Sequence, residues 1–136
     1  MGFIIFVFGL CVGSFLNVVV WRLNHGQSPL KGRSCCPKCK RQLRWFDNIP
    51  LLSFLWLGGK CRYCSQPISW QYPLVELATG FLTLGVYWLT AGPVLNLIFN
   101  LLAVWALMAI FVSDLVYMIV PDKAVFPTLL AAGGFW

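Results

Sequence analysis

The sequence predicts an all-α polytopic membrane protein with three transmembrane helices, the start of a fourth, and a cysteine-rich loop between the first two. Of its 136 residues, 60% are hydrophobic and only 10% are charged, with a mean hydropathy of +0.79. Charged residues make up about 25% of a typical soluble domain. The apolar residues also lie in runs of the length that a bilayer-crossing helix needs, about 20 residues. This composition excludes a soluble globular domain and a disordered chain.

Residues 1–22 are expected to form the first transmembrane helix. No charged side chain occurs before Arg22, which ends the apolar run. A cleaved signal peptide carries its positive charge ahead of its apolar run, whereas here the charge follows it. We therefore expect this helix to be retained.

Two further spans are predicted after residue 71. One runs over about 72–91 and contains a single charged residue, Glu76, and the next runs over about 93–113 and contains none. The Gly92-Pro93 pair between them indicates a tight turn. The chain becomes apolar again after Lys123, and this piece is interpreted as the start of a fourth helix. Residues 72–136 together form the membrane region that follows the loop.

Positive charge is concentrated in one loop, residues 23–71 with Arg22 at its border. Nine of the ten Lys and Arg residues lie between 22 and 62, and with Asp47 they give this stretch a net charge of +8. Lys and Arg are enriched in cytoplasmic loops. The loop is therefore expected in the cytoplasm, with the amino terminus and the 90–93 turn outside.

Four of the six cysteines form two C-x-x-C knuckles separated by 21 residues: Cys36 with Cys39, and Cys61 with Cys64. This pattern is typical of four-cysteine zinc sites. A cytoplasmic loop disfavours disulfides, and a redox pair needs only one knuckle. The spacing predicts one structural zinc, because four thiolates leave no open coordination position. Cys35 and Cys11 are not expected to be ligands.

Between the knuckles lies a short apolar stretch, residues 47–59. It is too short to span a membrane, and Pro50 opposes a helix at its start. Two interpretations stay open: the stretch lies on the membrane surface with Trp45 and Trp56 at headgroup level, or it forms the small core of the zinc loop.

Three acidic residues lie in or beside the predicted spans: Glu76, Asp114 and Asp122. An ionisable group in lipid is costly and is often functional. Glu76 and Asp114 are expected at similar depth on the cytoplasmic side. Asp114 is the candidate catalytic acid or base, with Glu76 and Asp122 as possible supporting groups. Each can also be a simple interfacial cap, and Asp122 fits that role best.

A set of motifs in fixed order resembles the type IV prepilin leader peptidase family. They are GSFLNVV at 13–19 followed by Arg22, CPKC at 36–39, DNIPL at 47–51, GGKC at 58–61, YPLVE at 72–76, and Asp114 with Pro121-Asp122. The set covers essentially the whole chain. The resemblance implies a bacterial inner-membrane enzyme that cuts the leader from prepilins and pseudopilins at the cytoplasmic face. It also implies methylation of the new amino terminus with S-adenosylmethionine, through residues that the motifs do not identify.

The family's peptidase is of the intramembrane aspartyl type, and its two aspartates lie on different helices. The first has a context that resembles Asp114, and the second belongs to a Gly-x-Gly-Asp motif that does not occur in residues 1–136. The chain alone is therefore expected to lack a complete peptidase site. Its end early in an apolar helix favours truncation over a native short form or one half of a split enzyme.

A binding function of another class is the alternative. A membrane-anchored zinc-ribbon module with so basic a loop could dock on anionic lipid or nucleic acid. The aromatic residues Trp45, Phe46, Phe54 and Trp56 cluster in an apolar run and do not alternate with the basic residues. The preferred partners are therefore prepilins and the lipid bilayer, without nucleic acid.

Overall fold

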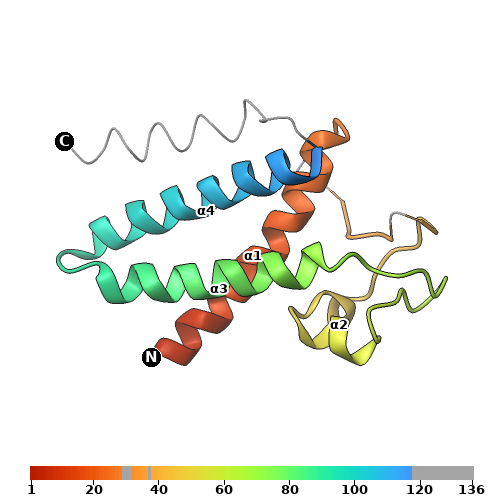
Figure 1. Ribbon diagram of the computed structural model, residues 1–136, viewed down its shortest axis with the longest axis horizontal. Coiled ribbons are helices and arrows are strands. Elements are labelled where there is room, and N and C mark those ends of the chain that lie inside the picture. The colour runs from red at the N-terminus through yellow and green to blue at the C-terminus, as the bar shows by residue number, and fades with distance from the viewer. Residues whose placement is uncertain (29–31, 37, 118–136) are drawn as a thin grey trace.

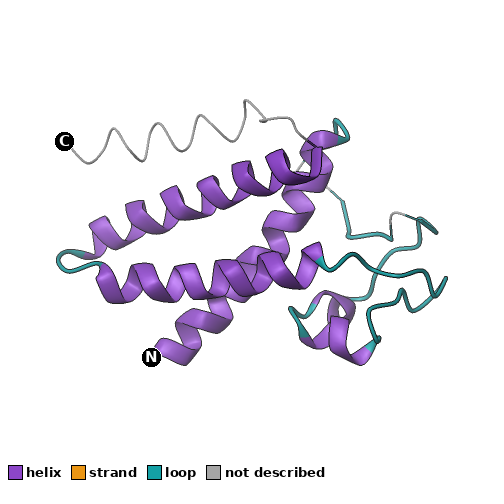
Figure 2. Cartoon of the chain, in the orientation of Figure 1, coloured by secondary structure: helices purple, strands orange, loops and turns teal. Residues whose placement is uncertain are grey.

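The computed structural model describes residues 1–28, 32–36 and 38–117, which are mostly helical and contain no strand (Figures 1 and 2). The elements are α1 (Gly2–Asn24), η1 (Trp45–Asn48), α2 (Leu52–Trp56), α3 (Gln71–Leu89) and α4 (Val94–Tyr117). The prediction of a mostly helical chain is confirmed. The predicted start of a fourth membrane helix and Asp122 lie outside the described residues.

The three long helices pack together, and the cysteine loop lies at one end of them. Helices α3 and α4 run antiparallel and are joined by a tight turn, while α1 crosses α3 obliquely (Figure 1). Two helices, α1 and α4, are long and apolar enough to cross a membrane. Helix α3 coincides with the second predicted span, residues 72–91, but it is not one of these two, so its crossing of the membrane stays a prediction.

Small residues allow α1 and α3 to approach closely. A Cβ added at Gly9 would lie 2.8 Å from the Cα of Gly80, and one at Gly13 would lie 2.8 Å from the Cα of Glu76. The two α1 glycines are four residues apart, in the small-xxx-small pattern that brings helix backbones together in membranes. The crossing of α1 and α3 therefore depends on the absence of side chains at these two positions.

Hydrogen bonds between side chains join α4 to the other two helices. The indole nitrogen of Trp105 donates to the Oγ1 of Thr83 at 3.0 Å, which links α4 to α3. The Nδ2 of Asn24 donates to the Oγ of Ser113 at 3.3 Å, which links α1 to α4. Thr83 and Ser113 are completely buried. Such interhelical bonds stabilise helix association where the hydrophobic effect is weak.

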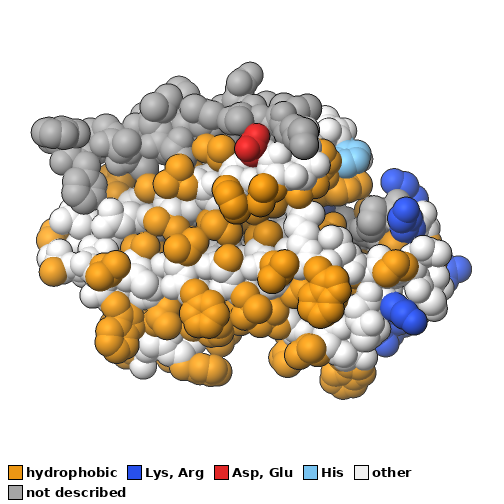
Figure 3. Space-filling model, viewed as in Figure 1, with side chains coloured by type: hydrophobic (Ala, Val, Ile, Leu, Met, Phe, Trp, Pro, Cys, Tyr) orange, Lys and Arg blue, Asp and Glu red, His pale blue; other side chains and the backbone are white. Residues whose placement is uncertain are grey.

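Large apolar side chains cover the outside of the helices. Phe81 on α3 and Phe111 on α4 are 62% and 57% exposed. Figure 3 shows hydrophobic side chains over the helices, whereas Lys and Arg gather at the end of the molecule that carries the loop. An apolar exterior with its positive charge at one end fits a bilayer environment.

Candidate metal centre and the adjoining cavity

The two C-x-x-C knuckles are closed by equivalent backbone hydrogen bonds. In the first, the N–H of Lys40 donates to the carbonyl of Cys36 at 2.9 Å, and in the second the N–H of Ser65 donates to the carbonyl of Cys61 at 3.0 Å. Lys40 and Ser65 stand at equivalent places and have φ values of 59° and 54°. Each knuckle is thus a tight turn that directs two thiols to the same side.

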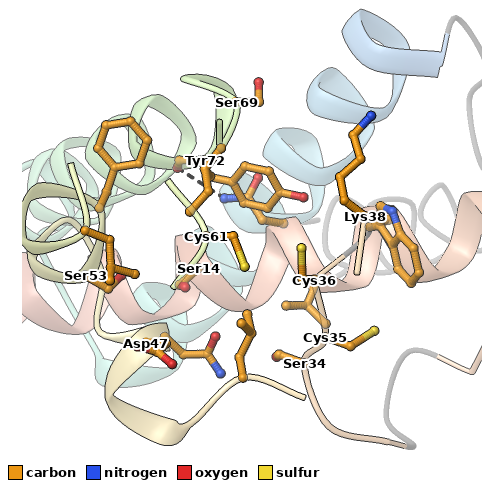
Figure 4. Close-up of a pocket in the computed structure, with 18 of the residues that line it drawn as sticks. Ser14, Ser34, Cys35, Cys36, Lys38, Asp47, Ser53, Cys61, Ser69 and Tyr72 are labelled. Atoms are coloured by element: carbon orange, nitrogen blue, oxygen red, sulfur yellow. Dashed lines mark hydrogen bonds between the residues drawn. The ribbon is translucent and has the colours of Figure 1, made fainter. Parts of the chain in front are cut away.

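The four thiols of the knuckles meet at one point. The sulfur atoms of Cys36, Cys39, Cys61 and Cys64 all lie within 4.8 Å of one another, and the Cys36 and Cys64 sulfurs are 3.9 Å apart. Zn–S bonds of about 2.3 Å in a tetrahedron place the sulfur atoms about 3.8 Å apart. The spacing and the thiol donor set therefore fit a four-coordinate metal ion. Cys35 is outside this group, and its sulfur points away from Cys36 and Cys61 (Figure 4).

The two thiols of the second knuckle differ in pKa. For Cys61, burial raises the pKa, but N–H groups of Cys64 and Tyr63 and neighbouring thiols outweigh it and lower the pKa to about 7. For Cys64, the N–H of Gln66 lowers the pKa, but burial and the neighbouring sulfurs outweigh it and raise the pKa to about 11. Crowded thiols resist full ionisation, and a bound divalent cation would offset the repulsion between thiolates.

An ion pair between the partly exposed Arg62 and the buried Asp47 fixes the second knuckle to η1. The side chain of Asp47 is 1% exposed and accepts from the guanidinium of Arg62 at 2.8 Å and 3.0 Å. The Arg62 guanidinium also lies 5.1 Å from the centre of the Phe46 ring. Arg62 is inside the Cys61–Cys64 turn, so this pair holds the cysteine cluster and η1 in one unit. Asp47 was part of a motif in the sequence, but nothing there identified its partner.

A cavity of about 420 Å³ lies between this unit and the loop-side ends of α1 and α3. Helix α1 contributes Ser14 and Asn17, the knuckles contribute Cys36 and Cys61, and α3 contributes Tyr72 and Glu76 (Figure 4 labels four of these). The volume is within the range of about 300–1,000 Å³ that small-molecule sites occupy. The cavity is the place where the cysteine cluster meets α1 and α3.

Glu76 joins the loop to α3. It is 7% exposed, and its Oε2 accepts a hydrogen bond from the backbone N–H of Leu51 at 2.9 Å. Leu51 has a φ of 58°, a conformation that L-residues rarely adopt. The carboxylate therefore holds a strained turn between η1 and α2 against the membrane helices.

Asn17 is a cavity residue that sequence reasoning missed. It is 3% exposed, and its Nδ2 donates to the carbonyl of Tyr72 at 3.2 Å. That carbonyl fixes which way the amide points, because an oxygen in the place of Nδ2 would face another oxygen. The Oδ1 is buried and has no hydrogen-bond partner among the residues that the structure describes. Its partner Tyr72 is 55 residues away in the sequence, so only its place in an apolar run and in the GSFLNVV motif could have drawn attention to it.

The structure does not bring Asp114 to this cavity. Asp114 is exposed near the end of α4 and is not among the cavity-lining residues. The end of α4 and the start of α3 are nevertheless on the same side of the molecule as the loop (Figure 1). Asp114 and Glu76 therefore share one end of the helices but have different surroundings.

Comparison with known proteins identifies relatives of the chain. Residues 7–90 match the model of the bacterial peptidase A24 N-terminal domain. A protein of Myxococcus xanthus named prepilin leader peptidase/N-methyltransferase is 46% identical over 127 residues, which are 93% of this chain and 38% of the relative. Proteins of the same name from Aeromonas hydrophila and Vibrio cholerae are 39% and 38% identical, again over 93% of this chain and over 51% and 53% of their own lengths.

The chain thus spans about half the length of the curated relatives it matches. No solved structure matches it significantly.

Proposed function

The chain belongs to the bacterial peptidase A24 N-terminal domain family, and from this we propose that it acts within a prepilin leader peptidase and N-methyltransferase. In this proposal residues 1–136 supply a structural zinc loop, the methyl-transfer cavity and one catalytic aspartate, Asp114. The substrates are type IV prepilins or pseudopilins. Cleavage of the leader needs a second aspartate, which the Gly-x-Gly-Asp motif provides in the family and which residues 1–136 lack in that form.

The cavity beside the cysteine cluster carries the proposal. It opens at the end of the helices where a substrate would have its new amino terminus, because a pilin has an apolar helix that lies in the bilayer. S-adenosylmethionine would supply the methyl group there. The buried Oδ1 of Asn17 and the Glu76 carboxylate add acceptor capacity and negative charge to the wall, and both suit an amine or a sulfonium ion.

Zinc in this proposal has a structural role. Cys36, Cys39, Cys61 and Cys64 would hold it, and their four thiolates would fill its coordination sphere. The ion would fix the two knuckles and thereby the cavity wall that Cys36 and Cys61 form.

Methyl transfer can be tested separately from cleavage. The purified chain is mixed with labelled S-adenosylmethionine and a mature pilin from which the leader has already been removed. We expect labelling of the pilin amino terminus, and we expect no cleavage of an intact prepilin by the chain alone. Ser69→Trp would place a large ring at the cavity wall and should reduce labelling, whereas Gln42→Trp, at an exposed residue outside it, should not. Equal labelling by both variants would contradict the assignment of the cavity.

The proposed topology places the loop in the cytoplasm and the amino terminus outside the inner membrane. The gathering of Lys and Arg at the loop end supports it (Figure 3). A membrane-impermeant thiol reagent should label Ala91→Cys in intact cells but not Gln42→Cys. Ala91 is preferable to Gly92 because Gly92 has a φ of +118°, where any side chain is strained. Labelling of the Gln42 variant alone would show that the orientation is the opposite of the one proposed.

A further inference from the structure

The stretch that connects the knuckles exposes its apolar side chains. We call residues 45–56, which comprise η1 and α2, the knuckle-bridging segment. Four of its large side chains face outward: Trp45 (78% exposed), Leu52 (61%), Leu55 (73%) and Trp56 (87%). If the segment formed the core of the zinc loop, these side chains would be buried. Figure 3 shows hydrophobic side chains over this part of the molecule, next to Lys and Arg.

The segment lies beside the first turns of α3, so it overlaps the start of that helix along the helix axis. The ring of Phe54 packs on Trp70, with centroids 4.9 Å apart, and Trp70 is the residue that caps the start of α3. Leu51 donates to Glu76, which is five residues into α3, or about 7.5 Å along the helix axis. If α3 enters the membrane near residue 71, α2 is at the depth of the lipid headgroups.

Cationic side chains border the segment and occupy the adjoining knuckle. Arg44 directly precedes it, and its guanidinium carbon lies 5.7 Å from the centre of the Phe46 ring. Arg62 lies 5.1 Å from the same ring but is paired with Asp47. Lys38, Lys40 and Arg41 belong to the adjoining knuckle and are at least partly exposed. Apolar side chains with basic residues at their border are typical of segments that bind an anionic membrane surface.

We propose that the knuckle-bridging segment inserts Leu52, Leu55 and Trp56 into the headgroup–acyl boundary of the leaflet that the loop faces, and that Arg44 and the exposed cations of the adjoining knuckle bind acidic phospholipid headgroups. The bilayer then holds the cysteine loop at a fixed height, with Glu76 as the direct link to α3. This proposal depends on the crossing of α3 and is independent of the methyl-transfer activity.

Depth-dependent quenching of tryptophan fluorescence tests the proposal. The full chain is placed in nanodiscs of phosphatidylglycerol and phosphatidylethanolamine, with bromine near either the carbonyl end or the methyl end of the acyl chains. The difference between the wild-type protein and Trp56→Phe isolates the emission of Trp56. We expect a loss of most of this emission with bromine near the carbonyl end, a smaller loss with bromine near the methyl end, and little quenching by aqueous iodide.

Controls make the result decisive. Trp88→Phe removes an exposed ring at the other end of α3 and should show a similar preference for shallow bromine, which calibrates the depth. Quenching of Trp56 by iodide and not by bromolipid would overturn the proposal. Protection of Trp56 from both quenchers would also overturn it. If a mature pilin abolished the quenching by bromolipid, the surface would be a protein-binding groove, and the proposal would fail as well. If bromolipid quenched the Trp56 emission equally in discs of phosphatidylcholine, the proposed role of the cations would be wrong.

Discussion

Adding a single methyl group at Gly13 should separate α1 from α3. A Cβ at this position would lie 2.8 Å from the Cα of Glu76 and 3.0 Å from the Cβ of Thr79. Carbon atoms that are not bonded prefer about 3.5–4.0 Å, so the contact with Glu76 is too short by about 0.7–1.2 Å. One of the two atoms is backbone and cannot rotate away, and therefore the helices themselves must move.

The cost of Gly13→Ala follows from this overlap. Overpacking a tight contact typically costs about 1–3 kcal/mol, and we expect a loss of that size in the free energy of unfolding. Gly9→Ala should have a similar effect, because its Cβ would lie 2.8 Å from the Cα of Gly80. Gly85→Ala is the matched control, since a Cβ there meets nothing within 4 Å. Alanine has the higher helix propensity by about 1 kcal/mol, so this variant should be no less stable than the wild-type protein.

Unfolding by increasing fractions of SDS in mixed micelles, followed by circular dichroism, measures these differences. Separation of the helices would also pull Asn17 on α1 from Tyr72 on α3 and so distort the cavity wall. Gly13→Ala should therefore lose methyl transfer before it loses zinc. The reasoning fails if Gly13→Ala and Gly85→Ala unfold at the same SDS fraction.

Three more predictions concern individual side chains. Cys36→Ser should lose the zinc, of which metal analysis should find about one per chain, whereas Cys35→Ser should keep it; zinc retained by both variants would contradict the ligand set. Protons compete with the metal for thiolates, and the pKa of Cys61 is about 7, so affinity measured with a competing chelator should fall further as the pH drops below neutral and Cys61 becomes protonated; constant affinity would exclude thiolate ligands. Glu76→Ala should expose residues 45–56 to added protease in detergent, whereas Glu76→Gln, which keeps an oxygen for the Leu51 N–H, should change little; equal protection in both variants would show that Glu76 does not hold the loop.

The long helices could be predicted from the sequence because a helix in lipid must satisfy its own backbone hydrogen bonds. Apolar runs therefore mark helices directly. The predicted span 1–22 corresponds to α1 (Gly2–Asn24), and the predicted span 93–113 corresponds to α4 (Val94–Tyr117), which continues past Asp114. How the helices pack could not be predicted. The Gly9 and Gly13 pattern is visible in the sequence, but its partner on α3 is given only by the three-dimensional structure.

The cysteine cluster could be predicted from local sequence spacing, whereas the cavity could not. Each knuckle is a local turn, so its spacing in the sequence already predicts that two thiols point the same way. The cavity depends on contacts between distant residues, such as Asn17 with Tyr72 and Asp47 with Arg62. For the stretch between the knuckles the sequence left two interpretations open, and the exposure of Leu55 and Trp56 disfavours the one in which it is a buried core.

The two acids near the loop-side end of the helices differ in a way that bears on catalysis. An aspartyl peptidase needs one carboxylate that accepts a proton from water and one carboxyl that donates to the substrate. Glu76 is buried and already accepts the Leu51 hydrogen bond, so using it to move protons would release the turn that it holds. Asp114 is exposed on α4 and is free of that constraint. We therefore expect Asp114→Asn to abolish leader cleavage once the remaining part of the enzyme is supplied, with zinc content unchanged. Glu76→Gln should leave cleavage intact, and a loss of cleavage in this variant with the loop still protected from protease would identify Glu76 as the second acid.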